Sequence, residues 1–123
     1  MALQIDAQRF RTWARLCTES LGLARDEIDA LNVFPVPDGD TGTNVFLTLE
    51  SARDALREAV AERPGDLRHG LAAYSRGALL GARGNSGVIL SQLIGALVRR
   101  IRDAGPEDRS ATVFAEAMEQ AAL

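Results

Sequence analysis

The chain has 123 residues, enough for one domain with a modest core, and 46% of them are hydrophobic. A formal net charge of −3 and a pI of about 5.1 argue against a nucleic-acid-binding domain, which usually carries a basic face. All fourteen basic residues are Arg, and the absence of Lys excludes Walker-type P-loop and Schiff-base mechanisms. The N-terminus does not read as a signal peptide, and the longest apolar stretch is too short to span a bilayer. We therefore expect a cytoplasmic protein without a transmembrane segment.

Apolar residues recur at three- and four-residue intervals, and no segment shows the sustained two-residue alternation of a strand. The pattern predicts an all-α fold with helices at 6–21, 25–32, 44–62, 66–80, 86–103 and 108–122. Pro64-Gly65 ends one predicted helix and Asp66 can cap the next, while Gly105-Pro106 precedes the last. Because these connections are short, neighbouring helices should run antiparallel, as in an up-and-down bundle.

Two residues with reactive side chains are better explained by structural roles than by catalysis. Cys17 is the only cysteine, and its spacing places it on an apolar helix face, which favours a buried, inert thiol. His69 is the only histidine, and with no nucleophile nearby it is expected to have a surface or half-buried structural role.

The last predicted helix presents an apolar face that needs a partner, formed by Phe114, Ala117, Met118 and Ala121. An ordinary C-terminal helix would explain this face. The sharper hypothesis is that residues 1–123 are the N-terminal part of a longer domain.

The first segment that departs from a plain bundle is Asn32–Asn44, with the sequence NVFPVPDGDTGTN. Asp38 and Asp40 are separated by one glycine, so their carboxylates can turn toward a common point and supply the oxygen ligands that Mg²⁺ prefers. The following helix start should offer free backbone N–H groups to an anion. Taken alone, Asp-Gly-Asp is a weak signal, and a polar turn with Asp38 or Thr43 as helix cap is the better interpretation of it. An EF-hand fails on spacing, because the twelfth position from Asp38 is Leu49 instead of Glu.

The second segment is Gly81–Gly87, with the sequence GARGNSG between two predicted helices. Gly81 suits a helix C-cap, and the other glycines leave room for a ligand near the backbone. Asn85 or Ser86 could cap the next helix or contact a phosphate, and Arg83 could face one. A tight helix–helix turn is an equally good interpretation. The glycine spacing matches neither a dinucleotide-binding fingerprint nor a nucleophile elbow.

The stretches LNVFPVPDGDTGTN and GARGNSGVILSQ resemble the N-terminal kinase domain of the bacterial fatty acid kinase ATP-binding subunit and, more broadly, the L domain of dihydroxyacetone kinases. The resemblance implies an up-and-down barrel of roughly eight antiparallel helices. It also implies ATP or ADP bound at one end, with Mg²⁺ bridging carboxylates and phosphates.

Carried over residue by residue, the resemblance makes Asp38 and Asp40 metal ligands. The phosphate side would be lined by Thr41, Thr43 and Asn44. A second phosphate-facing loop would consist of Gly84, Asn85, Ser86 and Gly87. Dihydroxyacetone kinases have a third aspartate upstream, whose nearest equivalents here are Asn32 and Val33, and Asn32 could supply an amide oxygen. No catalytic residue is assigned, and the adenine pocket would lie beyond this chain.

The function that the resemblance implies is phosphoryl transfer from Mg–ATP to a fatty acid carboxylate, giving an acyl phosphate. A separate fatty-acid-binding protein would present the acceptor, and a homodimer through other parts of the full-length protein stays open. The alternatives are dihydroxyacetone (glycerone) phosphorylation, a non-catalytic nucleotide-binding regulatory module and a plain interaction bundle.

Overall fold

The computed structural model describes residues 5–31, 40–104 and 111–122. These residues form five helices and no strand: α1 Ala7–Leu31, α2 Thr41–Glu62, α3 Leu67–Leu80, α4 Gly84–Asp103 and α5 Ala111–Ala122. The expected all-α class is therefore confirmed. No helix within these ranges is both long and apolar enough to cross a membrane.

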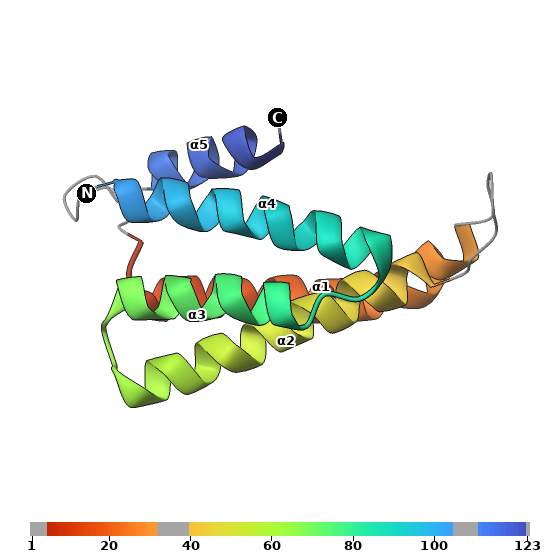
Figure 1. Ribbon diagram of the computed structural model, residues 1–123, viewed down its shortest axis with the longest axis horizontal. Coiled ribbons are helices and arrows are strands. Elements are labelled where there is room, and N and C mark those ends of the chain that lie inside the picture. The colour runs from red at the N-terminus through yellow and green to blue at the C-terminus, as the bar shows by residue number, and fades with distance from the viewer. Residues whose placement is uncertain (1–4, 32–39, 105–110, 123) are drawn as a thin grey trace.

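Successive helices alternate in direction, as expected for an up-and-down arrangement (Figure 1). The helix α2 packs against α1 and α3, and α4 packs against α3 and α5. Because the directions alternate, the C-terminal end of α1, the start of α2 and the turn from α3 to α4 all lie at one end of the molecule (Figure 1). Both sequence motifs adjoin this end.

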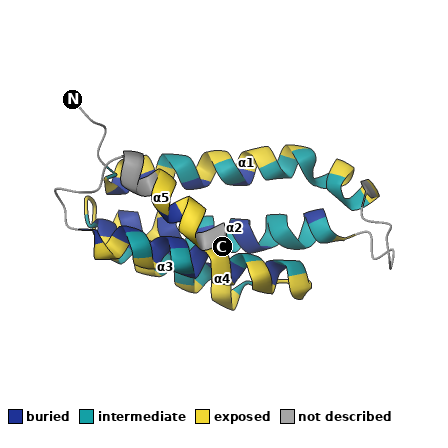
Figure 2. Cartoon of the chain, turned by 90° about the horizontal axis from the view of Figure 1, so that it is seen from above, coloured by how far each residue is buried: buried dark blue, intermediate teal, exposed yellow. Residues whose placement is uncertain are grey.

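The core is built around aromatic contacts between α1 and α3. The rings of Phe10 and Tyr74 meet edge to face with centroids 5.3 Å apart, and Phe10 stacks on Trp13 at 5.4 Å. Leu56 and Ile101, both at most 1% exposed, extend the core onto α2 and α4. Buried positions accordingly gather where these helices face one another, while the outer side of α1 is exposed (Figure 2). This core holds the helix ends that carry the motifs.

The structure differs from the sequence prediction at the first helix, which is continuous through the predicted break near residues 22–24. A glycine inside a helix costs about 1 kcal/mol relative to alanine. Here the glycine allows close packing, because a Cβ atom on Gly22 would lie 3.0 Å from the ring of Phe46 on α2. Gly22 is thus a close-approach position, and the prediction of two helices at 6–21 and 25–32 was wrong.

The remaining helix boundaries were predicted within three residues. Asp66 caps α3 as expected, since its carboxylate accepts a hydrogen bond from the backbone N–H of His69 at 3.0 Å. Gly81 is the C-cap of α3, as predicted. However, α2 begins at Thr41 and α4 begins at Gly84, so the motif residues 41–44 and 84–87 are first turns of helices and not loop positions.

An apolar cleft of about 240 Å³ lies between α1 and α4, and Met118 of α5 also lines it. Cys17 borders this cleft and is half-buried, where a buried thiol was expected, and partial burial raises the pKa of its thiol. Ala117 is fully buried, so α5 covers part of the apolar surface. The side chains of Phe114 and Ala121 lie outside the described residues.

Candidate functional site

The two motifs meet where the first turn of α2 touches the first residue of α4. A Cβ atom on Gly84 would lie 2.5 Å from Asn44 Nδ2, so the Asn44 side chain rests directly against the Gly84 backbone. Gly84 also has φ +66°, a conformation that residues with a Cβ rarely adopt. The positive φ favours glycine here, and the absence of a side chain lets the two predicted phosphate-side segments approach each other closely.

Thr48, which is fully buried, connects the same two segments. Its hydroxyl donates to the carbonyl oxygen of Asn44 at 2.8 Å and accepts the backbone N–H of Arg83 at 3.1 Å. A Cβ atom on Gly87 would lie 2.4 Å from Thr48 Oγ1, so this glycine makes room for the hydroxyl. Thr48 was not among the predicted site residues, and its only signal in the sequence is its position one helical turn after Asn44.

The start of α2 is also bonded to the end of α1. Thr43 donates its hydroxyl to Asp29 Oδ2 at 2.6 Å and its backbone N–H to Asp29 Oδ1 at 3.1 Å. Arg25 Nε in turn donates to the Thr43 hydroxyl at 3.0 Å. The Thr43 hydroxyl lowers the pKa of Asp29 most, and the backbone N–H groups of Thr43 and Gly42 and the charge of Arg25 lower it further, against the opposing effect of burial.

This arrangement alters the expectation of free N–H groups at the start of α2. The negatively charged Asp29 side chain already occupies the start of α2, because its carboxylate accepts hydrogen bonds from the first turn of that helix. The start of α4 differs. Its first N–H groups have no acceptor within their own helix, and Arg83 at the N-cap makes no side-chain capping bond. Gly84 and Asn85 are exposed there and Ser86 is half-buried, so α4 offers the better anion position.

The predicted metal ligands are only partly within the described residues. Asp40 is the N-cap of α2; its side chain is exposed and makes no capping hydrogen bond, while its carbonyl oxygen accepts the Asn44 N–H at 2.8 Å. Asp38 and Asn32 lie outside the described ranges. Within those ranges no three His, Cys, Asp or Glu side chains converge as a metal site. Because Mg²⁺ in nucleotide sites uses one or two carboxylates with phosphate and water, the exposed Asp40 carboxylate fits that chemistry.

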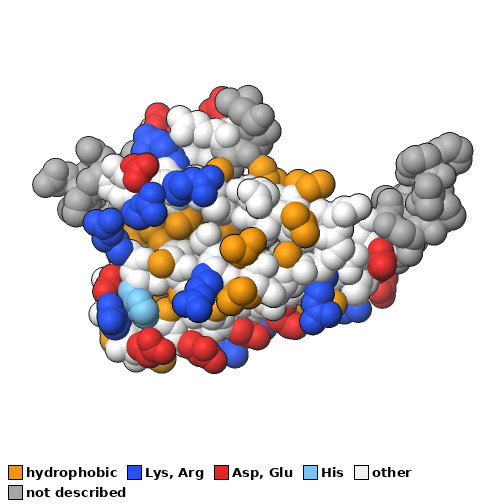
Figure 3. All heavy atoms as spheres, in the orientation of Figure 1, with side chains coloured by type: hydrophobic (Ala, Val, Ile, Leu, Met, Phe, Trp, Pro, Cys, Tyr) orange, Lys and Arg blue, Asp and Glu red, His pale blue; other side chains and the backbone are white. Residues whose placement is uncertain are grey.

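The segment that forms α3 and α4 is basic. Residues 67–102 contain six Arg and no Asp or Glu, although the whole chain has a net charge of −3. Basic side chains gather mostly toward the left of this face, away from the α3–α4 turn, whereas acidic side chains line the lower edge where α2 runs (Figure 3). Arg68, Arg99, Arg100 and Arg102 lie at the end of these two helices opposite the α3–α4 turn, so among the six only Arg83 directly adjoins the start of α4.

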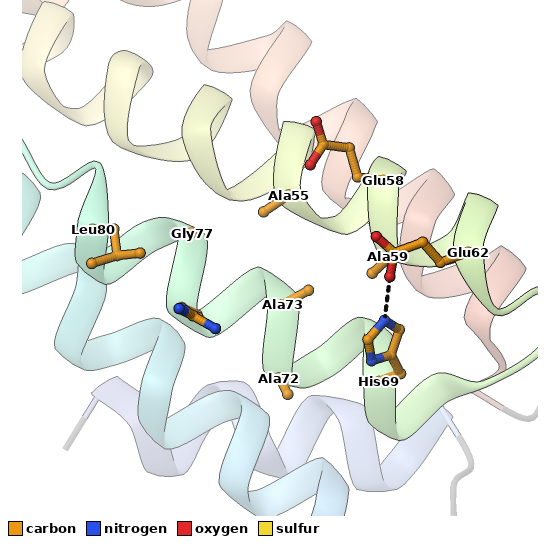
Figure 4. A pocket seen from close by; sticks show the side chains of 10 residues that line it. Ala55, Glu58, Ala59, Glu62, His69, Ala72, Ala73, Gly77 and Leu80 are labelled. Carbon is orange, nitrogen blue, oxygen red and sulfur yellow. Dashed lines mark hydrogen bonds and ion pairs between the residues drawn. The ribbon is translucent and has the colours of Figure 1, made fainter.

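A larger hollow of about 450 Å³ lies elsewhere, between α2 and α3. Its floor is made of small residues such as Ala55, Ala59 and Gly77, and it contains none of the predicted site residues (Figure 4). At its end His69 Nε2 lies 3.3 Å from a carboxylate oxygen of Glu62, which ties α3 to α2. His69 is half-buried in this contact, as expected for a structural residue.

Comparison with known proteins identifies the region that carries both motifs. Residues 35–123 match the DAK2 domain. An uncharacterised protein of Staphylococcus epidermidis is 40% identical over 119 residues, covering 97% of this chain and 21% of the relative. Uncharacterised proteins of Staphylococcus saprophyticus and Staphylococcus aureus are 46% and 42% identical, over 76% and 82% of this chain and 16% and 18% of their own lengths. The chain thus spans about a fifth of the length of these relatives, or less.

Proposed function

Because the chain belongs to the DAK2 domain family, whose members are nucleotide-binding modules related to kinases, we propose that it is part of a Mg²⁺-dependent kinase that transfers a phosphoryl group from ATP. The observation that supports this most is the contact between the starts of α2 and α4. Asn44 rests against Gly84, and Thr48 bonds to both segments, so the first turn of α2, which follows Asp40, lies beside the first residue of α4.

In this proposal Asp38 and Asp40 hold Mg²⁺, with Asn32 as a further oxygen donor. The metal, when bound, would neutralise charge on the phosphates and stabilise the transferred group. The first turn of α4, residues 84–87, binds the phosphates through its N–H groups, and Asn44 directs its amide toward the same place. These residues position and neutralise the nucleotide, which is most of what phosphoryl transfer requires of a protein.

For the acceptor we propose a fatty acid carboxylate presented by a separate lipid-binding protein. An ionised carboxylate needs no general base. This agrees with the site, since the only histidine is in the α2–α3 hollow and Asp29 is held by Thr43. Phosphorylation of dihydroxyacetone, an alcohol, would require a group to accept the hydroxyl proton. A purely regulatory nucleotide-binding module would bind Mg–ATP without turnover.

Calorimetric titration of ATP into the full-length protein, with and without Mg²⁺, tests the proposal. Asp38→Asn and Asp40→Asn each remove one carboxylate charge and should abolish or greatly weaken Mg–ATP binding and turnover. Asp54→Asn is the control, because Asp54 forms half-exposed ion pairs with Arg53 and Arg57, and such pairs contribute little. Parent-like binding of Mg–ATP in both aspartate variants would refute the metal assignment and remove the main support for a kinase.

A further inference from the structure

We infer that Asp29 is a positioning residue of the nucleotide site, acting through Thr43 to fix the first turn of α2. The inference rests on the proposed function. It also changes the role of Thr43, which the sequence motif placed among the phosphate ligands. Asp29 precedes both motifs and was not among the predicted site residues, so its part in the site follows from the tertiary structure alone.

The hydrogen bonds of the Thr43 hydroxyl are the first reason. A hydroxyl has one proton to donate, and here that proton goes to Asp29 Oδ2 at 2.6 Å. The hydroxyl oxygen also accepts from Arg25 Nε at 3.0 Å. The Thr43 side chain is therefore directed toward α1 and engaged on both sides, so it cannot donate to a phosphate without giving up a short, charge-assisted bond.

The close packing of the two helices is the second reason. A Cβ atom on Gly42 would lie 2.5 Å from the carbonyl oxygen of Arg25 and 3.0 Å from the Cβ of Ile28, so the first turn of α2 lies directly on the last turns of α1. The Arg25 guanidinium also lies over the Phe46 ring, 5.4 Å from its centroid. The first turn of α2 is thereby held by polar bonds and by backbone contact, and the next turn by the contact between Arg25 and the Phe46 ring.

The contacts of Thr43 with Asp29 and Arg25 affect the site because Thr43 adjoins the residues proposed to bind the nucleotide. Asp40 accepts the Asn44 N–H at 2.8 Å, and Thr43 lies between them in the same turn. A rotation of this turn would displace the Asp40 carboxylate and the Asn44 amide together. Asp29 also supplies the negative charge that the start of α2 favours, which leaves the start of α4 to bind the phosphate.

The test uses two matched pairs of variants in the full-length protein. Thr43→Val removes the hydroxyl at constant shape, while Thr43→Ser keeps it. Asp29→Asn removes the charge, while Asp26→Asn makes the same change at an exposed position of the same helix. Two quantities are measured: amide hydrogen exchange at residues 42–44 without nucleotide, and the Kd of Mg–ATP by calorimetry.

We expect Thr43→Val and Asp29→Asn to speed exchange at residues 42–44 and to weaken Mg–ATP binding by about tenfold, the loss expected for one charge-assisted hydrogen bond. Thr43→Ser and Asp26→Asn should behave like the parent. If Thr43 instead contacts phosphate, Thr43→Val would weaken binding but leave exchange unchanged, which overturns the inference. Faster exchange with a parent-like Kd would show that Asp29 stabilises the fold without positioning the nucleotide site, which would also overturn the inference. A parent protein that itself fails to bind Mg–ATP would overturn the proposed function, a result that these variants do not mimic.

Discussion

Replacing Thr48 with valine tests whether the buried hydroxyl joins the two halves of the site. The substitution keeps the branched shape and removes two hydrogen bonds, one to the Asn44 carbonyl oxygen and one from the Arg83 N–H. The first loss is small, because the carbonyl of a helical residue still accepts the N–H four residues later. The second leaves the Arg83 N–H without its acceptor, which costs about 1–3 kcal/mol when water is excluded.

Thr18 provides a matched control for this change. It is 1% exposed, and its hydroxyl donates to the carbonyl oxygen of Ala14 at 2.8 Å, the same bond to the preceding turn that Thr48 makes. Within the described residues it has no second partner comparable to the Arg83 N–H. Thr18→Val should therefore change the stability by no more than about 0.5 kcal/mol, since such bonds to the preceding turn add little to helix stability.

The difference between the two variants isolates the bond to Arg83. Because Arg83 is exposed and water can partly replace the lost acceptor, we expect Thr48→Val to lose about 1 kcal/mol more than Thr18→Val. Urea unfolding followed by circular dichroism measures this difference, and a lower Tm by a few degrees should accompany it. Thr48→Val should also weaken Mg–ATP binding, while Thr18→Val should not. Equal stability and equal nucleotide affinity in the two variants would refute the proposal that Thr48 links the start of α2 to the start of α4.

Two further predictions concern the core. The hydroxyl of Tyr74 is buried without a hydrogen-bond partner in the described structure, so Tyr74→Phe should leave stability at pH 7 unchanged or raise it by about 1 kcal/mol. Burial also raises the pKa of Tyr74 above the unfolded-state value of about 10. The free energy of unfolding is therefore unaffected by this group below about pH 10 and falls as the pH rises above that value, where the unfolded state loses the proton first. Urea unfolding at pH 7 and at a pH above about 10 should show that the stability of Tyr74→Phe falls less between the two than the stability of the parent does. Cys17, whose pKa is also raised, accounts for part of the remaining fall. An equal fall in the variant and the parent would contradict the prediction. Gly77→Ala should destabilise by about 1–3 kcal/mol despite alanine's better helix propensity, because the new Cβ would lie 2.9 Å from a backbone oxygen of α2. Gly95→Ala is its control, since its nearest neighbour is the flexible end of Arg99 at 3.2 Å, and equal Tm values for the two variants would refute the packing argument.

Features that depend on nearby residues were predictable from the chain alone. Helices follow from apolar residues spaced three and four apart, because that spacing produces one buried face whatever the fold. The Asp66 cap follows from a carboxylate placed three residues before the N–H of His69, a bond that forms within one turn. The position of the two motifs at one end of the molecule follows from short connections and alternating helix directions. The proposed ligand roles of Asp38 and Asp40 also come from a local pattern, and they stay predictions.

The role of each residue that contacts a distant part of the chain was decided by the tertiary structure. The helix break predicted near Gly22 is absent, and only the structure shows why a glycine stands there. A Cβ atom at this position would lie 3.0 Å from the Phe46 ring. The hydrogen bond that Thr43 donates to Asp29, 14 residues earlier in the chain, has no signal in the sequence motif. The bond that Thr48 accepts from the Arg83 N–H has no local signal, because this partner is 35 residues away. Periodicity specifies which face of a helix is buried, but the atoms that meet across that face depend on how neighbouring helices are placed, and in this protein that placement turns two polar segments into one candidate site.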